Sequence, residues 1–184
     1  IFSTYEHFYA WRKIESGSEE KDGIESLFTM IDGLFRKDRL LDVIQNFVYF
    51  PDDSVKTELK IVANYPQYFS SRKLHANILK QKKPHGNGKG GTYFGTTGCG
   101  KSWGMVFLSR LLMRTPELSS PTIILITDRI DLDEQLSDNF VPSKRFLCEQ
   151  EIINIESRED LKDKLLRKAS GGIYLTTIQK FTED

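Results

Sequence analysis

The apolar positions in the first part of the chain recur with the spacing of amphipathic helices. Residues 24–35 and 38–47 both place apolar side chains at i, i+3 and i+4, and Asp38 can cap the second helix. We expect the apolar sides of both helices to be buried, with Ile24, Leu27, Phe28, Ile31, Leu34 and Phe35 in the first and Leu40, Leu41, Ile44 and Phe47 in the second. Pro66 suits the first turn of a third helix that runs to about residue 80.

After Gly91 the pattern changes to strands that alternate with helices. We expect strands at 92–94, 122–127, 152–155 and 172–178, and helices at 103–114, 130–139 and 157–166, the last capped by Ser157. Residues 122–127 (TIILIT) lack polar alternation, which is typical of a parallel strand covered on both faces. The pattern therefore predicts an α/β fold, with a parallel sheet built from right-handed βαβ units and flanked by helices.

Composition indicates an ordinary soluble domain. The chain has 184 residues, of which 39% are apolar and 28% charged, and its formal net charge is zero. A neutral total argues against a dedicated basic nucleic-acid module but leaves room for a local basic groove, because the local field decides binding. The loop at residues 81–91 carries Lys82, Lys83 and Lys89, and both a solvated linker and a phosphate-backbone contact fit it.

Cysteine usage and the lengths of the apolar runs bear on the compartment. Cys99 and Cys148 form neither a disulfide framework nor a zinc motif, so we expect a reducing, cytoplasmic setting. The run at 122–127 is too short for a membrane span, and no signal peptide is present, so no membrane partner is expected. Because the chain opens at Ile1 without an initiator Met, we expect it to be a piece of a longer protein.

The strongest chemical signal is the segment GTTGCGKS at residues 95–102, which fits the phosphate-loop pattern G-x-x-x-x-G-K-S/T. Such a loop surrounds a triphosphate with backbone N–H groups and presents it to a helix N-terminus. The residues expected to form this cradle are Gly95, Thr96, Thr97, Gly98, Cys99 and Gly100. Lys101 supplies a charge for the β- and γ-phosphates, and the hydroxyl of Ser102 is a hard oxygen ligand suited to Mg²⁺.

Several ordered blocks resemble the motor (R) subunit of type I restriction enzymes, which belongs to helicase superfamily 2. The blocks are EHFYAWRKIE at 6–15, YPQY at 65–68, GTYFGTTGCGKS at 91–102, ITDRIDLDEQL at 126–136 and GGIYLTTIQKF at 171–181. The resemblance implies a RecA-like P-loop NTPase fold for residues 65–184, as an incomplete first motor lobe. It implies that residues 1–64 are a helical linker following a nuclease domain, and that the Asp-Glu-x-His motif lies beyond Asp184.

The resemblance also implies an activity and partners. The whole protein would be an ATP-dependent translocase and endonuclease of double-stranded DNA, using ATP and Mg²⁺ and acting with a modification (M) and a specificity (S) subunit. Gln67 would recognise adenine through its amide, with Tyr65 or Tyr68 stacking on the base. The open alternative for Gln67 is a helix-start residue facing solvent.

The same resemblance places nucleic-acid contacts at the carboxyl ends of the predicted strands at 122–127 and 172–178. The candidates are Arg129, Thr176, Thr177 and Gln179, whose polar groups suit phosphate oxygens. Ordinary strand threonines are the alternative for the two Thr residues. At the level of the whole chain, a P-loop small-molecule kinase, another superfamily 2 helicase or translocase, and a non-catalytic ATP-dependent interaction module remain alternatives.

Overall fold

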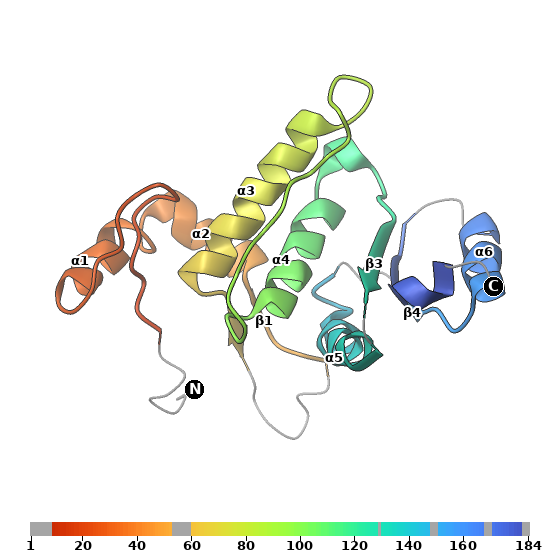
Figure 1. The fold of residues 1–184 in the computed structure, drawn as a ribbon. Helices are drawn as coiled ribbons and strands as arrows, with labels where there is room; N and C mark the ends of the chain where they lie inside the picture. Colours follow the sequence, from red (N-terminus) through yellow and green to blue (C-terminus); the bar gives the residue numbers. More distant parts are fainter. Residues whose placement is uncertain (1–8, 53–59, 129, 148–150, 168–170, 182–184) are drawn as a thin grey trace. The chain divides into compact units, whose positions relative to one another are not determined.

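The computed structural model describes residues 9–52, 60–128, 130–147, 151–167 and 171–181 (Figure 1). The chain divides into two compact units. Unit 1 comprises residues 1–50 and 54–108, and unit 2 comprises residues 51–53 and 109–184. No helix in the described ranges has both the length and the apolar character needed to cross a membrane.

Unit 1 is mainly helical. Its elements are α1 (Glu25–Asp32), α2 (Lys37–Asn46), β1 (Val48–Tyr49), β2 (Ile61–Val62), α3 (Tyr65–Gln81) and the first part of α4 (Lys101–Met113). The two short strands pair antiparallel, with Val48 opposite Val62. The two helices predicted from apolar spacing and the third predicted from Pro66 are therefore confirmed, and Pro66 does lie in the first turn of α3.

Aromatic side chains form the core of unit 1. Phe47 and Phe107 are fully buried with ring centroids 5.4 Å apart, and the ring of Tyr68 lies 4.8 Å from Phe47. Trp11, in the segment before α1, packs its ring against Tyr68 and Phe69 at 5.7 and 5.9 Å. Tilted aromatic pairs at these distances are favourable beyond the area they bury, so this cluster fixes α3 against its neighbours in the unit.

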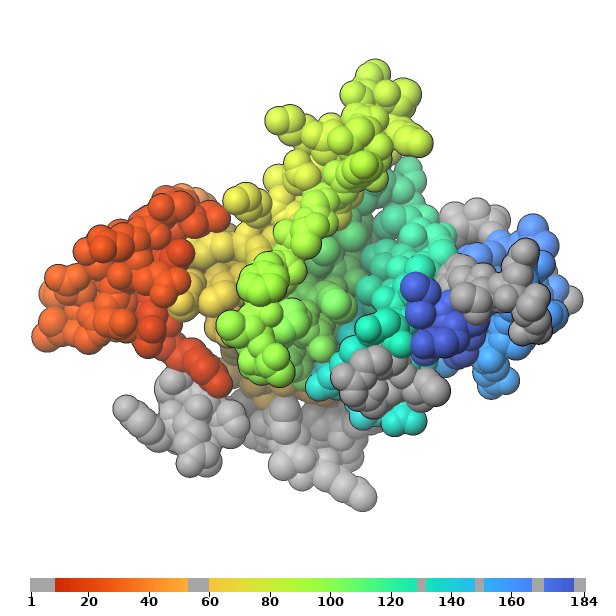
Figure 2. All heavy atoms as spheres, in the orientation of Figure 1, coloured from red at the N-terminus to blue at the C-terminus, as the bar shows by residue number. Residues whose placement is uncertain are grey.

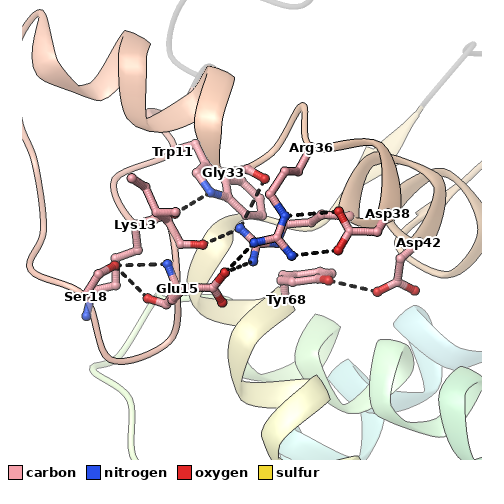
Figure 3. A network of polar contacts seen from close by, with 11 residues as sticks. Trp11, Lys13, Glu15, Ser18, Gly33, Arg36, Asp38, Asp42 and Tyr68 are labelled. Carbon is pink, nitrogen blue, oxygen red and sulfur yellow. Dashed lines mark hydrogen bonds and ion pairs between the residues drawn. The ribbon is translucent and has the colours of Figure 1, made fainter.

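A network of polar contacts joins the N-terminal segment to α2 (Figure 3). Arg39 is 5% exposed, and its guanidinium donates to the carbonyls of Ile14 and Gly33 and to the carboxylate of Glu15 at 3.0 Å. The same carboxylate oxygen accepts a hydrogen bond from Arg36 at 2.8 Å. A buried guanidinium is tolerated only when its donors are satisfied, and here backbone carbonyls and one carboxylate do so.

Asp42 makes the corresponding link between α2 and α3. Its carboxylate accepts hydrogen bonds from the Tyr68 hydroxyl at 2.9 Å, from Nε of Arg72 at 2.7 Å and from the Asn46 amide at 2.8 Å. Burial, followed by the neighbouring Asp42 carboxylate, raises the pKa of Tyr68 to about 12. The phenol therefore remains protonated and donating at neutral pH.

The expected burial of the apolar sides of α1 and α2 is mostly wrong. The apolar residues that are exposed instead are Ile24, Leu27, Phe28, Ile31 and Phe35 around α1, and Leu41 and Ile44 on α2. The buried residues of the two helices are Thr29, Arg39, Val43 and Asn46. The capping prediction for Asp38 also fails: Arg36 is the N-cap residue, and the Asp38 carboxylate binds its guanidinium at 2.6 Å.

Unit 2 carries the predicted parallel sheet. Its strands are β3 (Ile123–Thr127), β4 (Ile152–Asn154) and β5 (Ile173–Thr177), in the order β3-β5-β4, and its α-helices include α5 (Ile130–Phe140) and α6 (Arg158–Arg167). Short 3₁₀ turns lie at Pro116–Leu118, Val141–Ser143 and Ile178–Phe181. Ile173 lies opposite both Ile123 and Ile152 in the parallel registers. The α/β fold with a parallel sheet and flanking helices is thus confirmed.

The strand order explains the burial of β5. The crossover through α5 and the crossover through α6 run in opposite directions across the sheet, and right-handed connections then place these helices on opposite faces. All five residues of β5 are buried, and Leu161 of α6 packs with Ile155 against Tyr174. The expectation that β3 is covered on both faces is wrong. It is an edge strand of this sheet, with Ile124 38% and Ile126 53% exposed.

The strand expected at residues 92–94 is not formed. The segment is irregular, and Phe94 is 91% exposed. A strand needs a partner for its backbone groups, and none pairs with these residues in the described sheets. Instead, the chain turns back after α3 and runs along that helix before it enters α4 (Figure 1).

Candidate functional site

The loop at residues 95–102 leads directly into α4, which begins at Lys101. Gly98 and Gly100 have φ angles of +79° and +78°, a left-handed conformation that glycine adopts without a Cβ clash. The side chains of Thr96 and Thr97 are exposed. The loop thus curls tightly at the start of a helix, where unpaired N–H groups and the positive end of the helix dipole favour an anion.

Lys101 holds this curl through its own side chain. The ammonium donates to the carbonyl oxygens of Gly95 at 3.0 Å and Thr96 at 2.8 Å, and so closes the loop from its far end. A Cβ on Gly95 would lie 2.7 Å from Sγ of Cys99, so glycine lets the two residues approach without displacing the thiol. These carbonyls are neutral acceptors, whereas a phosphate oxygen carries negative charge and adds Coulomb attraction to its hydrogen bond with the ammonium. The lysine is therefore positioned to exchange them for a triphosphate.

Gln67 contacts the phosphate loop directly. It is 6% exposed, and its amide Nε2 donates to the carbonyl of Gly100 at 3.1 Å, while Oε1 accepts from the backbone N–H of Asn64 at 3.0 Å. A Cβ on Gly100 would lie only 2.3 Å from Nε2, so any other residue here would displace the Gln67 amide from this contact. The alternative of a solvent-facing glutamine is wrong. Adenine recognition stays a prediction, and it would require this amide to change partners.

Asn64 is the residue of this site that the sequence analysis missed. Its side chain accepts the N–H of Gln67 at 3.1 Å, which completes a reciprocal capping box at the start of α3. The signal was present as the N-x-x-Q spacing of Asn64 and Gln67, which spans Pro66. The box fixes the rotamer of Gln67, and this rotamer is the one that reaches Gly100.

Tyr65, the predicted base-stacking residue, is the first residue of α3. Its ring lies edge-on to Trp11 at 6.3 Å, and burial, followed by the carboxylate of Glu20, raises its pKa. The ring is half-buried and part of the aromatic cluster of unit 1. Stacking of Tyr65 on a base stays a prediction.

Ser102 fits the role of a magnesium ligand. It is half-buried at the second position of α4, and its hydroxyl makes no hydrogen bond in the part of the chain that the structure describes. A free hydroxyl oxygen next to the phosphate cradle is the donor that Mg²⁺ uses in such loops. Among the described residues no group of three or more His, Cys, Asp or Glu side chains could hold a metal by itself. Here Mg²⁺ would depend on Ser102 together with phosphate oxygens.

The predicted nucleic-acid residues lie in unit 2 and differ in exposure. Thr176 is fully buried and Thr177 is 4% exposed, so neither presents a hydroxyl at the surface of this structure. Gln179 is exposed, and its amide donates to the carbonyl of Asp128 at 2.8 Å, which ties the end of β5 to the end of β3. Arg129 lies outside the described residues. Their contacts with DNA stay predictions.

Sequence comparison identifies the family of phosphate-loop proteins to which the chain belongs. The family of SWI2/SNF2 ATPases matches residues 66–184, which include the phosphate loop, α4 and the parallel sheet. The chain belongs to the SWI2/SNF2 ATPase family. The family match begins at residue 66, one residue after the predicted start of the motor lobe at residue 65. The compact units of the structure divide elsewhere, within α4. The division into a linker at 1–64 and a motor lobe at 65–184 stays a prediction.

Relatives of the chain over nearly its whole length are restriction proteins. It is 34% identical, over 98% of its length, to the type I restriction enzyme HindI endonuclease subunit of Haemophilus influenzae. It is 29% identical, over 97% of its length, to the putative type I restriction enzyme MjaIXP endonuclease subunit of Methanocaldococcus jannaschii. The chain spans only 17% and 18% of the lengths of these two relatives. The predicted resemblance to type I restriction subunits is thereby confirmed.

Proposed function

We propose that the chain is the ATP-binding motor part of the R subunit of a type I restriction-modification enzyme. The whole protein would translocate double-stranded DNA at the expense of ATP and cut it, with ATP and Mg²⁺ as cofactors. It would act in the cytoplasm with a modification (M) and a specificity (S) subunit. The observation that carries the proposal is the closed phosphate loop at the start of α4 in a member of an ATPase family whose relatives are restriction endonuclease subunits.

The residues divide the work of holding the nucleotide. The backbone N–H groups of residues 95–100 surround the phosphates, and Lys101 leaves the carbonyls of Gly95 and Thr96 to pair with phosphate oxygens. The Ser102 hydroxyl ligates Mg²⁺, which neutralises charge on the phosphates when bound. Gln67 exchanges its hydrogen bond to the Gly100 carbonyl for adenine, and this exchange couples base recognition to the loop.

In this proposal, contacts with DNA come from the carboxyl ends of the strands of the sheet. Gln179 and Arg129 supply phosphate-directed groups that read no sequence, as a moving motor requires. Thr176 and Thr177 contribute only after β5 becomes accessible at its carboxyl end, because both are buried in this structure.

The test uses the full-length protein with its partner subunits. ATP hydrolysis should be stimulated by double-stranded DNA, and displacement of a third DNA strand annealed downstream should report translocation. Lys101→Ala should abolish both, whereas the matched variant Lys37→Ala, an exposed lysine at the start of α2, should retain both. Turnover stimulated by a nucleoside or a sugar but not by duplex DNA would favour a small-molecule kinase. Translocation that survives Lys101→Ala would exclude residues 95–102 as the ATP site that drives the motor and would favour a non-catalytic interaction module.

A further inference from the structure

The charges of this neutral chain are strongly segregated along the sequence. Residues 59–116 contain ten Lys and Arg and not one Asp or Glu, although the chain has 26 acidic residues in all. This stretch therefore carries a formal charge of +10, and the rest of the chain carries −10. A net charge of zero conceals a basic region that contains α3 and the phosphate loop.

Within this basic stretch a groove of about 580 Å³ lies between α3 and residues 90–93. Lys73 and Lys80 line it from one side of the helix, and Leu74 and Ala76 give it an apolar floor. Figure 2 shows the segment after α3 (lime) lying on the surface of unit 1 beside that helix (yellow). The groove belongs to unit 1 alone and does not include the phosphate loop itself.

The wall of the groove is built by close backbone approach. The amide of Asn77 donates to the carbonyl of Gly90 at 2.5 Å and fixes the segment on α3. A Cβ on Gly90 would lie 2.7 Å from Cγ1 of Ile78, so a larger residue there would have to displace the Ile78 side chain. The groove is therefore a defined feature of the local sequence.

The two lysines of the groove, Lys73 and Lys80, have no acidic partner among the described residues. Arg72 is paired with Asp42, and Lys101 is bound to loop carbonyls, whereas Lys73 and Lys80 form no ion pair with any residue that the structure describes. They are seven residues apart, which corresponds to about 10 Å of helix rise. Two cations spaced along one side of a helix suit the repeated charges of an extended polyanion.

We propose that this groove binds the phosphate backbone of double-stranded DNA. The inference rests on the proposed function, since that function makes duplex DNA the track of the motor. Lysines are point charges that do not read base edges, so the contact is blind to sequence, as translocation requires. The hollow in unit 2 has four carboxylates and one lysine, Lys180, in its lining, so its net charge is negative and disfavours the same ligand.

The test measures the salt dependence of binding of the full-length protein to a short duplex DNA without ATP. Each neutralised phosphate contributes about 0.9 to the slope of log K against log salt, so Lys73→Gln/Lys80→Gln should make the slope shallower by about 1.8. With a common intercept at 1 M salt, this corresponds to about 60-fold weaker binding at 0.1 M. Lys73→Arg/Lys80→Arg should retain the slope of the wild type, and ATP affinity should be unchanged in both variants.

The matched control is Lys37→Gln/Lys162→Gln, which removes the same charge from exposed positions outside the basic stretch. An equal loss of slope in this control would show a general charge effect and overturn the groove. An unchanged slope in Lys73→Gln/Lys80→Gln, or a loss seen only with single-stranded DNA, would also overturn it. If Lys73→Gln/Lys80→Gln binds DNA normally while the wild type translocates, the groove proposal is wrong and the proposed motor function is retained. If the wild type binds no duplex DNA, both proposals are wrong.

Discussion

Strand β5 and helices α1 and α2 have equally clear apolar patterns, but the apolar side chains of β5 are buried and most of those of the two helices are exposed. All five residues of β5 are buried between neighbours in unit 2, whereas the apolar sides of α1 and α2 in unit 1 are largely exposed. The two helices bury three polar residues, Thr29, Arg39 and Asn46, and one apolar residue, Val43. Periodicity thus predicts which element forms, but the partners available to an element decide which side it buries. Unit 2 is held by aliphatic packing and this part of unit 1 by a satisfied polar network.

The largest expected effect follows truncation of the buried strand. Leu175→Ala removes a fully buried side chain from the middle of β5 and should destabilise the chain by about 3 kcal/mol, because a cavity remains. Urea denaturation of residues 1–184 measures this cost. Leu166→Ala, at a position 85% exposed, is the matched control and should change stability by less than about 0.5 kcal/mol. Similar destabilisation by Leu175→Ala and Leu166→Ala would contradict the view that burial of β5 stabilises unit 2.

The next effect tests whether the polar network is as important to unit 1 as packing is to unit 2. Arg39→Met keeps the aliphatic volume but leaves the carbonyls of Ile14 and Gly33 without their donor, and should cost about 2 kcal/mol. Arg36→Met removes the exposed partner of the same Glu15 carboxylate and should cost well under about 1 kcal/mol. An Arg39→Met variant as stable as the wild type would contradict the account.

A smaller effect is expected on the exposed side of α2. Leu41 is 67% exposed, so Leu41→Ala should change the stability of residues 1–184 by less than about 0.5 kcal/mol. Val43→Ala, two positions away and 4% exposed, removes less carbon yet should cost about 1.5 kcal/mol. A reversed order would show that the apolar side of α2 is buried after all.

The smallest effect concerns the exposed pair of Arg36 and Asp38. The hydrogen bond and charge of Arg36 lower the pKa of Asp38 from 3.8 to about 2. A depressed carboxyl pKa stabilises the fold above the unfolded pKa, and this contribution is lost as pH falls from about 4 through about 2. Asp38→Asn should therefore flatten slightly the acid limb of the urea midpoint against pH. In an Arg36→Gln background the same substitution should change nothing, and a full effect there would assign the shift to another partner.

The elements and the phosphate loop could be predicted because both depend on local sequence. GTTGCGKS needs only backbone conformation and a following helix, and each is encoded within a few residues. The contact between Gln67 and Gly100 could not be predicted from periodicity, because it joins residues 33 apart. The strand expected at 92–94 failed for the same reason, since a strand exists only where a distant partner accepts its hydrogen bonds.

The most direct test of the account is the affinity of the full-length protein for Mg²⁺-ATP, measured by titration calorimetry with wild type, Lys101→Ala and the control Lys37→Ala. Lys101 is placed to give charge-assisted hydrogen bonds to phosphate, so its loss should weaken binding by about 10- to 100-fold, while Lys37→Ala binds as the wild type does. Equal affinities of the wild type and Lys101→Ala would contradict the assignment of residues 95–102 as the nucleotide site.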